Sequence, residues 1–145
     1  MPAYSIKRTV IGCIEKGADL YNTITRIIRE NQIRIGRVTA MGAVQSARLA
    51  FYDQKGLQYR ELSFDEPLEI VSLYGNISIK DGSPFAHIHV SLSDRHGATH
   101  GGHLLPDHTP VFACEVIIEE FDGEDLVRKA EKETGLALWG NEARL

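Results

Sequence analysis

The chain alternates short apolar runs with turn-forming residues, and this pattern predicts a domain built mainly of β-strands. In the first and the last of these runs, apolar positions recur at every second residue, the period of a strand that packs one face on a core. The runs predicted to be strands are 4–14, 33–41, 43–52, 57–64, 68–79, 85–93 and 110–121. The turn-forming segments between them predict hairpins, at 53–56 and 80–83.

One segment has the period of a helix. Between Leu20 and Ile28 the apolar residues are spaced by three or four positions, which places them in one stripe against a sheet. Asp19 is a suitable N-cap, and the helix is predicted to run to about Asn31. A second, short helix is predicted to start in the acidic segment at Asp122 and to end at about Lys132.

These elements add up to an α+β fold: a central, mostly antiparallel sheet of six to eight strands, with one main helix and a short C-terminal helix. Gly42 stands between the predicted strands 33–41 and 43–52, and it predicts a β-bulge or a close approach of two backbones there. The length of 145 residues and the ordinary composition predict one domain, 1–145.

Composition also bears on location and partners. No apolar run is long enough to cross a bilayer, and the N-terminus lacks the basic and apolar segments of a signal peptide, so we expect a cytoplasmic protein with no membrane partner. Cys13 and Cys114 each lie in an apolar run and are predicted to be buried thiols rather than a disulfide.

The formal charge of −4 argues against a surface devoted to nucleic acid. The basic residues are concentrated in the second half of the predicted helix and the start of the strand after it, and we interpret them as a solvated helix edge: Arg26, Arg29, Arg34 and Arg37.

The six histidines all lie between His87 and His108. His87 and His89 stand two apart in an apolar run, so on a strand their imidazoles project from the same face. His103 follows in a glycine-flanked segment that is predicted to be a bend, after enough chain to turn back, so three imidazoles can converge. Two interpretations remain open at this point: a metal or other ligand site, and a cluster that is merely hydrogen-bonded. The other histidines are interpreted as members of a polar loop: His96, His100 and His108.

Several separate segments, in order along nearly the whole chain, are similar to the PPC domain, the plants and prokaryotes conserved domain. They are Gly42-Ala43-Val44, the run from Glu69 to Ser78, Asp81-Gly82, the run from His87 to Asp94, Gly101-Gly102-His103-Leu104 and Glu133-Thr134-Gly135-Leu136. The resemblance implies an α+β fold with a central antiparallel sheet, a homotrimer, and a metal site at His87, His89 and His103.

In plants this domain accompanies an AT-hook, a basic segment that enters the minor groove of DNA. The nearest string here is Arg34-Ile35-Gly36-Arg37, which has an apolar residue in its middle, no proline, and a predicted strand conformation. A DNA-binding or DNA-associated regulatory role is therefore the alternative rather than the first expectation.

Three histidine ligands leave one coordination position open, as in catalytic zinc sites, and zinc is the expected divalent transition metal. We therefore expect a homotrimeric metal- or small-ligand-binding protein, with a metal-dependent enzyme acting on a small molecule as a further alternative. Glu69 and Glu115 are candidate metal partners or general bases, although solvent-facing strand charges are the simpler interpretation of both. Asn76 and Arg48 are candidate polar contacts for a ligand. Trp139 is expected to pack over a core edge or a subunit contact.

Overall fold

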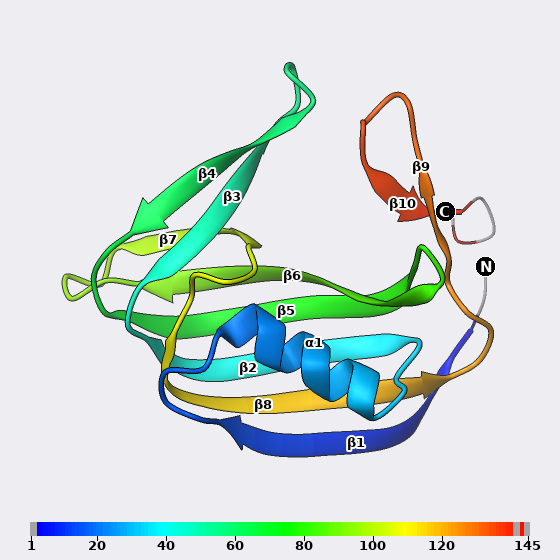
Figure 1. The fold of residues 1–145 in the computed structure, drawn as a ribbon, viewed down its shortest axis with the longest axis horizontal. Coiled ribbons are helices and arrows are strands. Elements are labelled where there is room, and N and C mark those ends of the chain that lie inside the picture. Colours follow the sequence, from blue (N-terminus) through cyan, green and yellow to red (C-terminus); the bar gives the residue numbers. More distant parts are fainter. Residues whose placement is uncertain (1–2, 141–142, 144–145) are drawn as a thin grey trace.

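The computed structural model describes residues 3–140 and 143, and it contains an antiparallel sheet of eight strands in the order β1-β8-β2-β5-β6-β7-β3-β4 (Figure 1). Its strands include every run that the sequence pattern predicts. Their bounds are β1 (Ser5–Ile14), β2 (Gly36–Val44), β3 (Ala47–Asp53), β4 (Gln58–Phe64), β5 (Leu68–Lys80), β6 (Ser83–Ser93), β7 (Thr99–Leu104) and β8 (Val111–Asp122).

The main helix, α1 (Leu20–Glu30), lies on one face of the sheet (Figure 1). It comes close to β6, where the Tyr21 hydroxyl donates a hydrogen bond to the carbonyl oxygen of Ala86 at 3.2 Å. The Asp19 carboxylate accepts a hydrogen bond from the backbone N–H of Asn22 at 2.8 Å and so caps the helix as predicted. Three members of the apolar stripe, Leu20, Ile24 and Ile28, are fully buried in the core, and Ile27 is partly buried against it. No α-helix within residues 3–140 covers the opposite face of the sheet (Figure 1).

The predicted irregularity at Gly42 is confirmed. The register between β2 and β5 shifts between Ala40 and Gly42, which is the signature of a β-bulge. Gly42 has φ of +141°, and a Cβ placed there would lie 2.1 Å from the carbonyl oxygen of Ala113 on β8. Both expectations for this glycine, a bulge and a close backbone approach, therefore apply.

The predicted C-terminal helix is wrong. The segment after β8 instead forms β9 (Arg128–Ala130), which pairs with β10 (Ala137–Trp139) in a separate two-stranded sheet. Val127 also forms a parallel bridge with Ile79 at the end of β5. These long-range contacts hold the segment extended, and they outweigh the weak helical preference of its acidic start.

Two further expectations need correction. The glycine-rich segment around His103 is not a bend but the strand β7, which pairs with β6 on one side and β3 on the other. Both cysteines are free thiols as predicted, but only Cys114 is buried. Cys13 is exposed because it projects from the uncovered face of the sheet, beside Glu115.

The β3–β4 hairpin and the β9–β10 hairpin rise from the sheet at opposite ends of β6 (Figure 1). They are joined where the Tyr52 hydroxyl donates a hydrogen bond to the carbonyl oxygen of Thr134. The two hairpins thus form an arch over the strands that carry the histidines. No helix among the described residues combines the length and apolar character needed to span a membrane.

Candidate metal centre

The three predicted histidines come together on one face of two paired strands. His87 and His89 are alternate residues of β6, and His103 of β7 lies directly opposite His89 in the register. Their ring centroids are 5.0 to 5.5 Å apart, and one ligand atom from each ring lies within 4.8 Å of the others. Pairing of β6 with β7 therefore achieves the convergence that the sequence pattern predicts.

The cluster fits a transition-metal ion in size and chemistry. The Nε2 atoms of His87 and His89 are 3.1 Å apart, close to the ~3.3 Å separation of two nitrogens bound tetrahedrally at about 2.05 Å from zinc. The Nδ1 atom of His103 is buried and has no hydrogen-bond partner. A buried nitrogen left in this way costs free energy, which coordination or a bound water would offset. The three rings thus offer three ligand nitrogens, and no protein group among the described residues competes with a metal ion for Nδ1 of His103.

Two of the rings are held neutral, the form that can bind a metal. Burial, followed by the positive charges of Arg128 and His89, lowers the pKa of His87 to about 4. Burial also lowers the pKa of His103 to about 4, with the other two histidines and Arg128 adding to the effect. Neutral imidazole keeps the nitrogen lone pair available, so both side chains are ready to coordinate at neutral pH.

These shifts predict how the stability of the metal-free protein depends on pH. An unfolded histidine takes up a proton near pH 6.5, whereas His87 and His103 stay neutral in the folded chain down to about pH 4. Protons therefore favour the unfolded state in this window, so stability is full above pH 6.5 and falls towards pH 4. Because both rings are only partly buried, we expect a loss of about 1 kcal/mol for each.

Urea unfolding of the metal-free protein at pH 7.5, 5.5 and 4.5 measures this loss. The double variant His87→Gln/His103→Gln serves as the reference, since its carboxylates titrate as in the parent chain. The variant should lose less stability than the parent between pH 7.5 and 4.5. Identical pH profiles would show that the two rings titrate normally.

The histidines lie between two cavities under the arch. Both cavities are lined by His87, His103, Tyr59 and Leu136. The first, of about 400 Å³, extends towards Tyr21 on α1. The second, of about 630 Å³, opens on the uncovered face of the sheet and includes His89. The centre is thus reachable from two sides.

Arg128 of β9 is the main residue of this region that the sequence pattern does not indicate. It lines the first cavity, and its charge contributes to the lowered pKa of both His87 and His103. Asn76, which was expected to offer a polar contact, lies opposite His87 in the register and accepts a hydrogen bond from Arg128 at 2.6 Å. Asn76 therefore holds Arg128 in place and lines neither of the two cavities itself.

The other candidate polar groups lie elsewhere. Arg48 pairs with Asp65 at 2.6 Å and lines neither cavity. Glu115 is exposed on β8, across from Met41 of β2. Neither side chain is placed to support the histidines.

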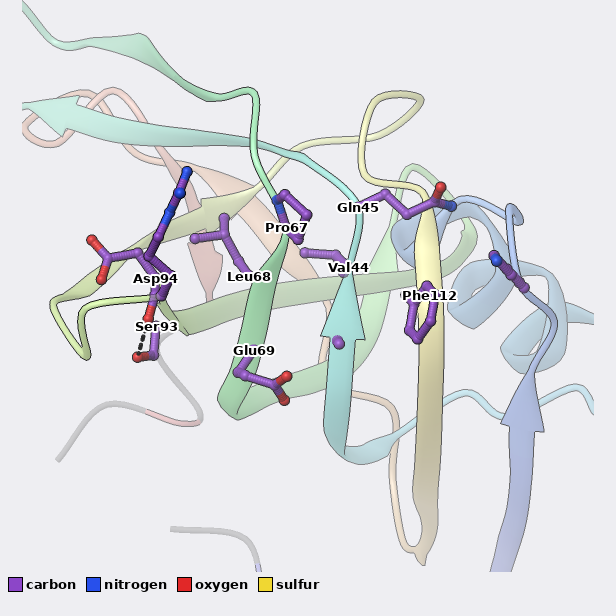
Figure 2. Close-up of a pocket in the computed structure, with 11 residues that line it drawn as sticks. Val44, Gln45, Pro67, Leu68, Glu69, Ser93, Asp94 and Phe112 are labelled. Atoms are coloured by element: carbon purple, nitrogen blue, oxygen red, sulfur yellow. Dashed lines mark hydrogen bonds between the residues drawn. The ribbon is translucent and has the colours of Figure 1, made fainter.

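Glu69 belongs to a different cavity, of about 640 Å³, where it lies with Ser93, Asp94 and Phe112 (Figure 2). Figure 2 shows these side chains at the ends of their strands, with none of the three clustered histidines among them. Both candidate carboxylates are thus separate from the three-histidine cluster, in accordance with their interpretation as strand charges.

The remaining histidines do not join the cluster. His96 and His108 are exposed in loops, as expected. His100 departs from the expected loop because it lies on β7, where its Nε2 is 3.3 Å from the Asp94 carboxylate. Trp139 of β10 is partly exposed, and the Arg128 guanidinium lies 5.9 Å from the centroid of its ring. It also lines a cavity together with the buried residues Ile35 and Ile77.

Three of the four clustered arginines are neutralised by ion pairs. Arg34 pairs with Asp125 and Arg37 with Glu119. Arg26 pairs with the carboxylate one helical turn further along α1 at 3.0 Å. The cluster therefore offers less positive surface than its sequence indicates, in agreement with its interpretation as a solvated edge.

The geometry can now be compared with known proteins. The Plants and Prokaryotes Conserved (PCC) domain matches residues 1–122. The chain belongs to this family. The match covers all eight strands of the main sheet and all three clustered histidines, and the family resemblance of the sequence is confirmed.

Solved structures of PCC-like proteins share the fold over nearly their full length. A metal-containing protein from Archaeoglobus fulgidus is 39% identical, with a TM-score of 0.89 over 96% of this chain and 97% of that one. A plant- and prokaryote-conserved protein from Pyrococcus horikoshii is 30% identical, with a TM-score of 0.90 over 97% and 96%. A protein from Bacteroides thetaiotaomicron, proposed to bind DNA, is 26% identical, with a TM-score of 0.85 over 96% and 98%.

Similarity also extends to part of a larger protein. The bifunctional protein GlmU of Synechococcus sp. strain JA-2-3B'a(2-13) is 30% identical over 120 residues, which is 82% of this chain. The chain spans only 18% of the length of that relative. A segment similar to this chain therefore also occurs within a longer polypeptide.

Proposed function

We propose that this PCC-family protein binds one divalent transition-metal ion per chain through His87, His89 and His103, with zinc as the favoured ion. The observation that carries the proposal is the convergence of three imidazoles, one ligand atom from each lying within 4.8 Å of the others. The buried Nδ1 of His103, which has no partner, supports it. So does the similarity to the metal-containing archaeal protein.

Three protein ligands leave a coordination position for water or a small ligand, because zinc is usually four-coordinate. When bound, such an ion supplies Lewis acidity and lowers the pKa of a bound water. The contribution of the chain is to hold two neutral imidazoles, His87 on β6 and His103 on β7, and to bury them partly from water. A small-molecule ligand is therefore part of the proposal, and a metal-dependent reaction is its extension.

Metal analysis of the purified, tag-free protein tests the proposal. After dialysis against zinc and removal of the excess, we expect one zinc ion per chain by elemental analysis. Parallel dialysis against nickel, cobalt and iron ranks the ions, since imidazole sites accept several of them. A stoichiometry near zero for every ion would contradict the proposal.

We further propose that the protein assembles as a homotrimer through the uncovered face of the sheet. Cross-strand pairing places Ile11, Ile117, Thr39, Tyr74 and His89 in one continuous row on that face. The apolar members of the row are well exposed, with Ile11 72% and Tyr74 55% accessible. An apolar face of this kind usually marks an interface, and a subunit seated on it would close the second cavity.

Light scattering during size-exclusion chromatography tests the trimer. The parent chain should show three times its 16.2 kDa mass, whereas Ile117→Asp should elute as a monomer because it buries a charge at the centre of the row. Phe112→Asp is the matched control, since Phe112 is also exposed on β8 but lies at the start of the strand, beside Lys16 and away from the row. A monomeric parent chain would remove the proposal.

DNA binding is the second candidate function, favoured by similarity to the Bacteroides protein that is proposed to bind DNA. It ranks below metal binding here because three of the four clustered arginines already pair with carboxylates of the same chain. Such pairs weaken the electrostatic attraction that dominates binding to the phosphate backbone.

A further inference from the structure

Arg128 is a half-buried cation beside the histidines that has no carboxylate within salt-bridge distance among the described residues. Its Nε donates to the Ser78 hydroxyl and one terminal nitrogen to the carbonyl oxygen of Ala137, each at 2.9 Å. The other terminal nitrogen donates to the Asn76 side-chain oxygen at 2.6 Å. All three acceptors are neutral. Since a guanidinium carries five N–H groups, two remain for another partner.

The guanidinium is held in a fixed position rather than left mobile. It lies 5.3 Å from the ring centroid of Phe85 and 5.9 Å from that of Trp139. Ser78 and Asn76, which hold it, are paired in the register with Phe85 and His87. The cation is therefore fixed above the part of the sheet that adjoins the first histidine.

The cavity shared by Arg128, His87 and His103 is suited to an anion. Its volume is about 400 Å³, which is in the range of small-molecule sites. Lys80 contributes a second cation, and no aspartate or glutamate of the described part of the chain lines this cavity. The remaining walls are largely apolar, with Phe85 and Leu138 among them.

An unpaired charge in such a place is unfavourable without a ligand. Burial lowers the pKa of Arg128, which reports the cost of keeping the charge away from water. A carboxylate would offset that cost, because a guanidinium and a carboxylate form short, charge-assisted hydrogen bonds. The planar donor groups of Arg128 favour a carboxylate, and the apolar walls favour an apolar body attached to it.

We propose that this cavity binds a small carboxylate with an apolar body, which pairs with Arg128 and directs its carboxylate end towards the metal centre. The contact with the ion rests on the proposed function, whereas the contact with Arg128 does not. The ligand class is thus set by one fixed cation, one open coordination position and the apolar walls between α1 and β9.

Calorimetric titration of the zinc-loaded protein with benzoate, benzamide and inorganic phosphate tests the ligand class. Benzoate should bind saturably at one site per chain. Benzamide, which has the same shape without the charge, and phosphate, which has charge without the apolar body, should each bind at least about tenfold more weakly. Tighter binding of phosphate or equal binding of benzamide would overturn the assignment to carboxylates.

The variant Arg128→Gln tests the role of the cation. It should weaken benzoate binding about tenfold to hundredfold while it retains one zinc ion per chain. Arg128→Lys keeps the charge but loses the planar guanidinium, so its affinity for benzoate should lie between that of the parent chain and that of Arg128→Gln. Arg95→Gln is the control and should bind benzoate as the parent does, because Arg95 is exposed, pairs with Glu66 and lies outside this cavity.

The two levels of the proposal fail separately. Zinc bound without any benzoate binding, or with equal benzoate affinity in folded Arg128→Gln, would overturn the carboxylate site and leave the metal site standing. Zinc absent from the parent chain would overturn the metal site, and the same titrations on the metal-free protein would still measure the Arg128 contact. Thermal unfolding of each variant confirms that it is folded, and the comparison of benzoate with benzamide needs no variant.

Discussion

Replacing Gly42 by alanine is expected to destabilise the protein by about 3 kcal/mol or more, a large share of the stability of a single domain. The new Cβ would lie 2.1 Å from the carbonyl oxygen of Ala113 and 2.8 Å from the Cα of Cys114. Both are backbone atoms of β8, so no side-chain rotation can relieve the clash. The φ of +141° is in addition a conformation that alanine rarely adopts. Urea unfolding monitored by circular dichroism measures the change.

Two other glycines of the same sheet separate the causes. Gly12→Ala in β1 is the matched control, since nothing lies within 4 Å of its new Cβ, and it should be neutral or slightly stabilising. Gly36→Ala tests the clash alone, because its Cβ would lie 2.1 Å from the carbonyl oxygen of Glu119 at an ordinary φ. If Gly42→Ala were as stable as Gly12→Ala, β2 and β8 would have to be free to separate at the bulge.

Gly42 also shows why much of the fold is predictable from the sequence. A glycine that interrupts an apolar run indicates a local backbone irregularity, and the β2–β5 register shift lies there. The N-cap at Asp19 and the turn at 53–56 are similarly determined by neighbouring residues. Features of this kind depend on contacts a few positions apart, which the sequence pattern records directly.

The two strands that the sequence pattern did not predict, β7 and β9, depend on contacts with residues that are distant in the sequence. The segment that holds β9 is extended because it pairs with β10 and bridges to Ile79 of β5. Its Arg128 is also hydrogen-bonded to Ser78 and Asn76, about 50 positions earlier in the chain. β7 has few apolar residues, and it is a strand because β6 and β3 supply partners on both of its sides. Its glycines permit this close packing, since a Cβ on Gly102 would lie 2.8 Å from the carbonyl oxygen of Ala50.

The candidate site divides in the same way. His87 and His89 share a face because of the two-residue period of a strand, so their proximity follows from sequence alone. The position of His103 opposite His89 follows from the β6–β7 register, which the length of the connecting segment permitted but did not determine. Arg128 carried no local signal at all, since the residues that fix it lie on β5.

Replacing His103 by alanine is expected to lower the affinity for zinc by at least about a hundredfold. Two ligands would remain, both on β6, and the partner that closes the site from β7 would be lost. Loss even of groups that only support metal ligands costs tenfold to hundredfold in affinity, so loss of a direct ligand should cost more. Competition with a chromophoric chelator at pH 7.5 measures the change.

The stability of the variant gives a second, independent measure of the same coordination. Ligand binding to the folded state raises the apparent stability by RT ln(1 + [L]/Kd), so zinc should raise the Tm of the parent chain and leave that of His103→Ala nearly unchanged. The double variant His96→Ala/His108→Ala is the matched control, because both of its histidines are exposed and lie outside the cluster. It should bind zinc as the parent does. Equal zinc affinity in His103→Ala and in this control would mean that β7 contributes no ligand, and the ion would then have to be held by β6 and groups outside the three-histidine cluster.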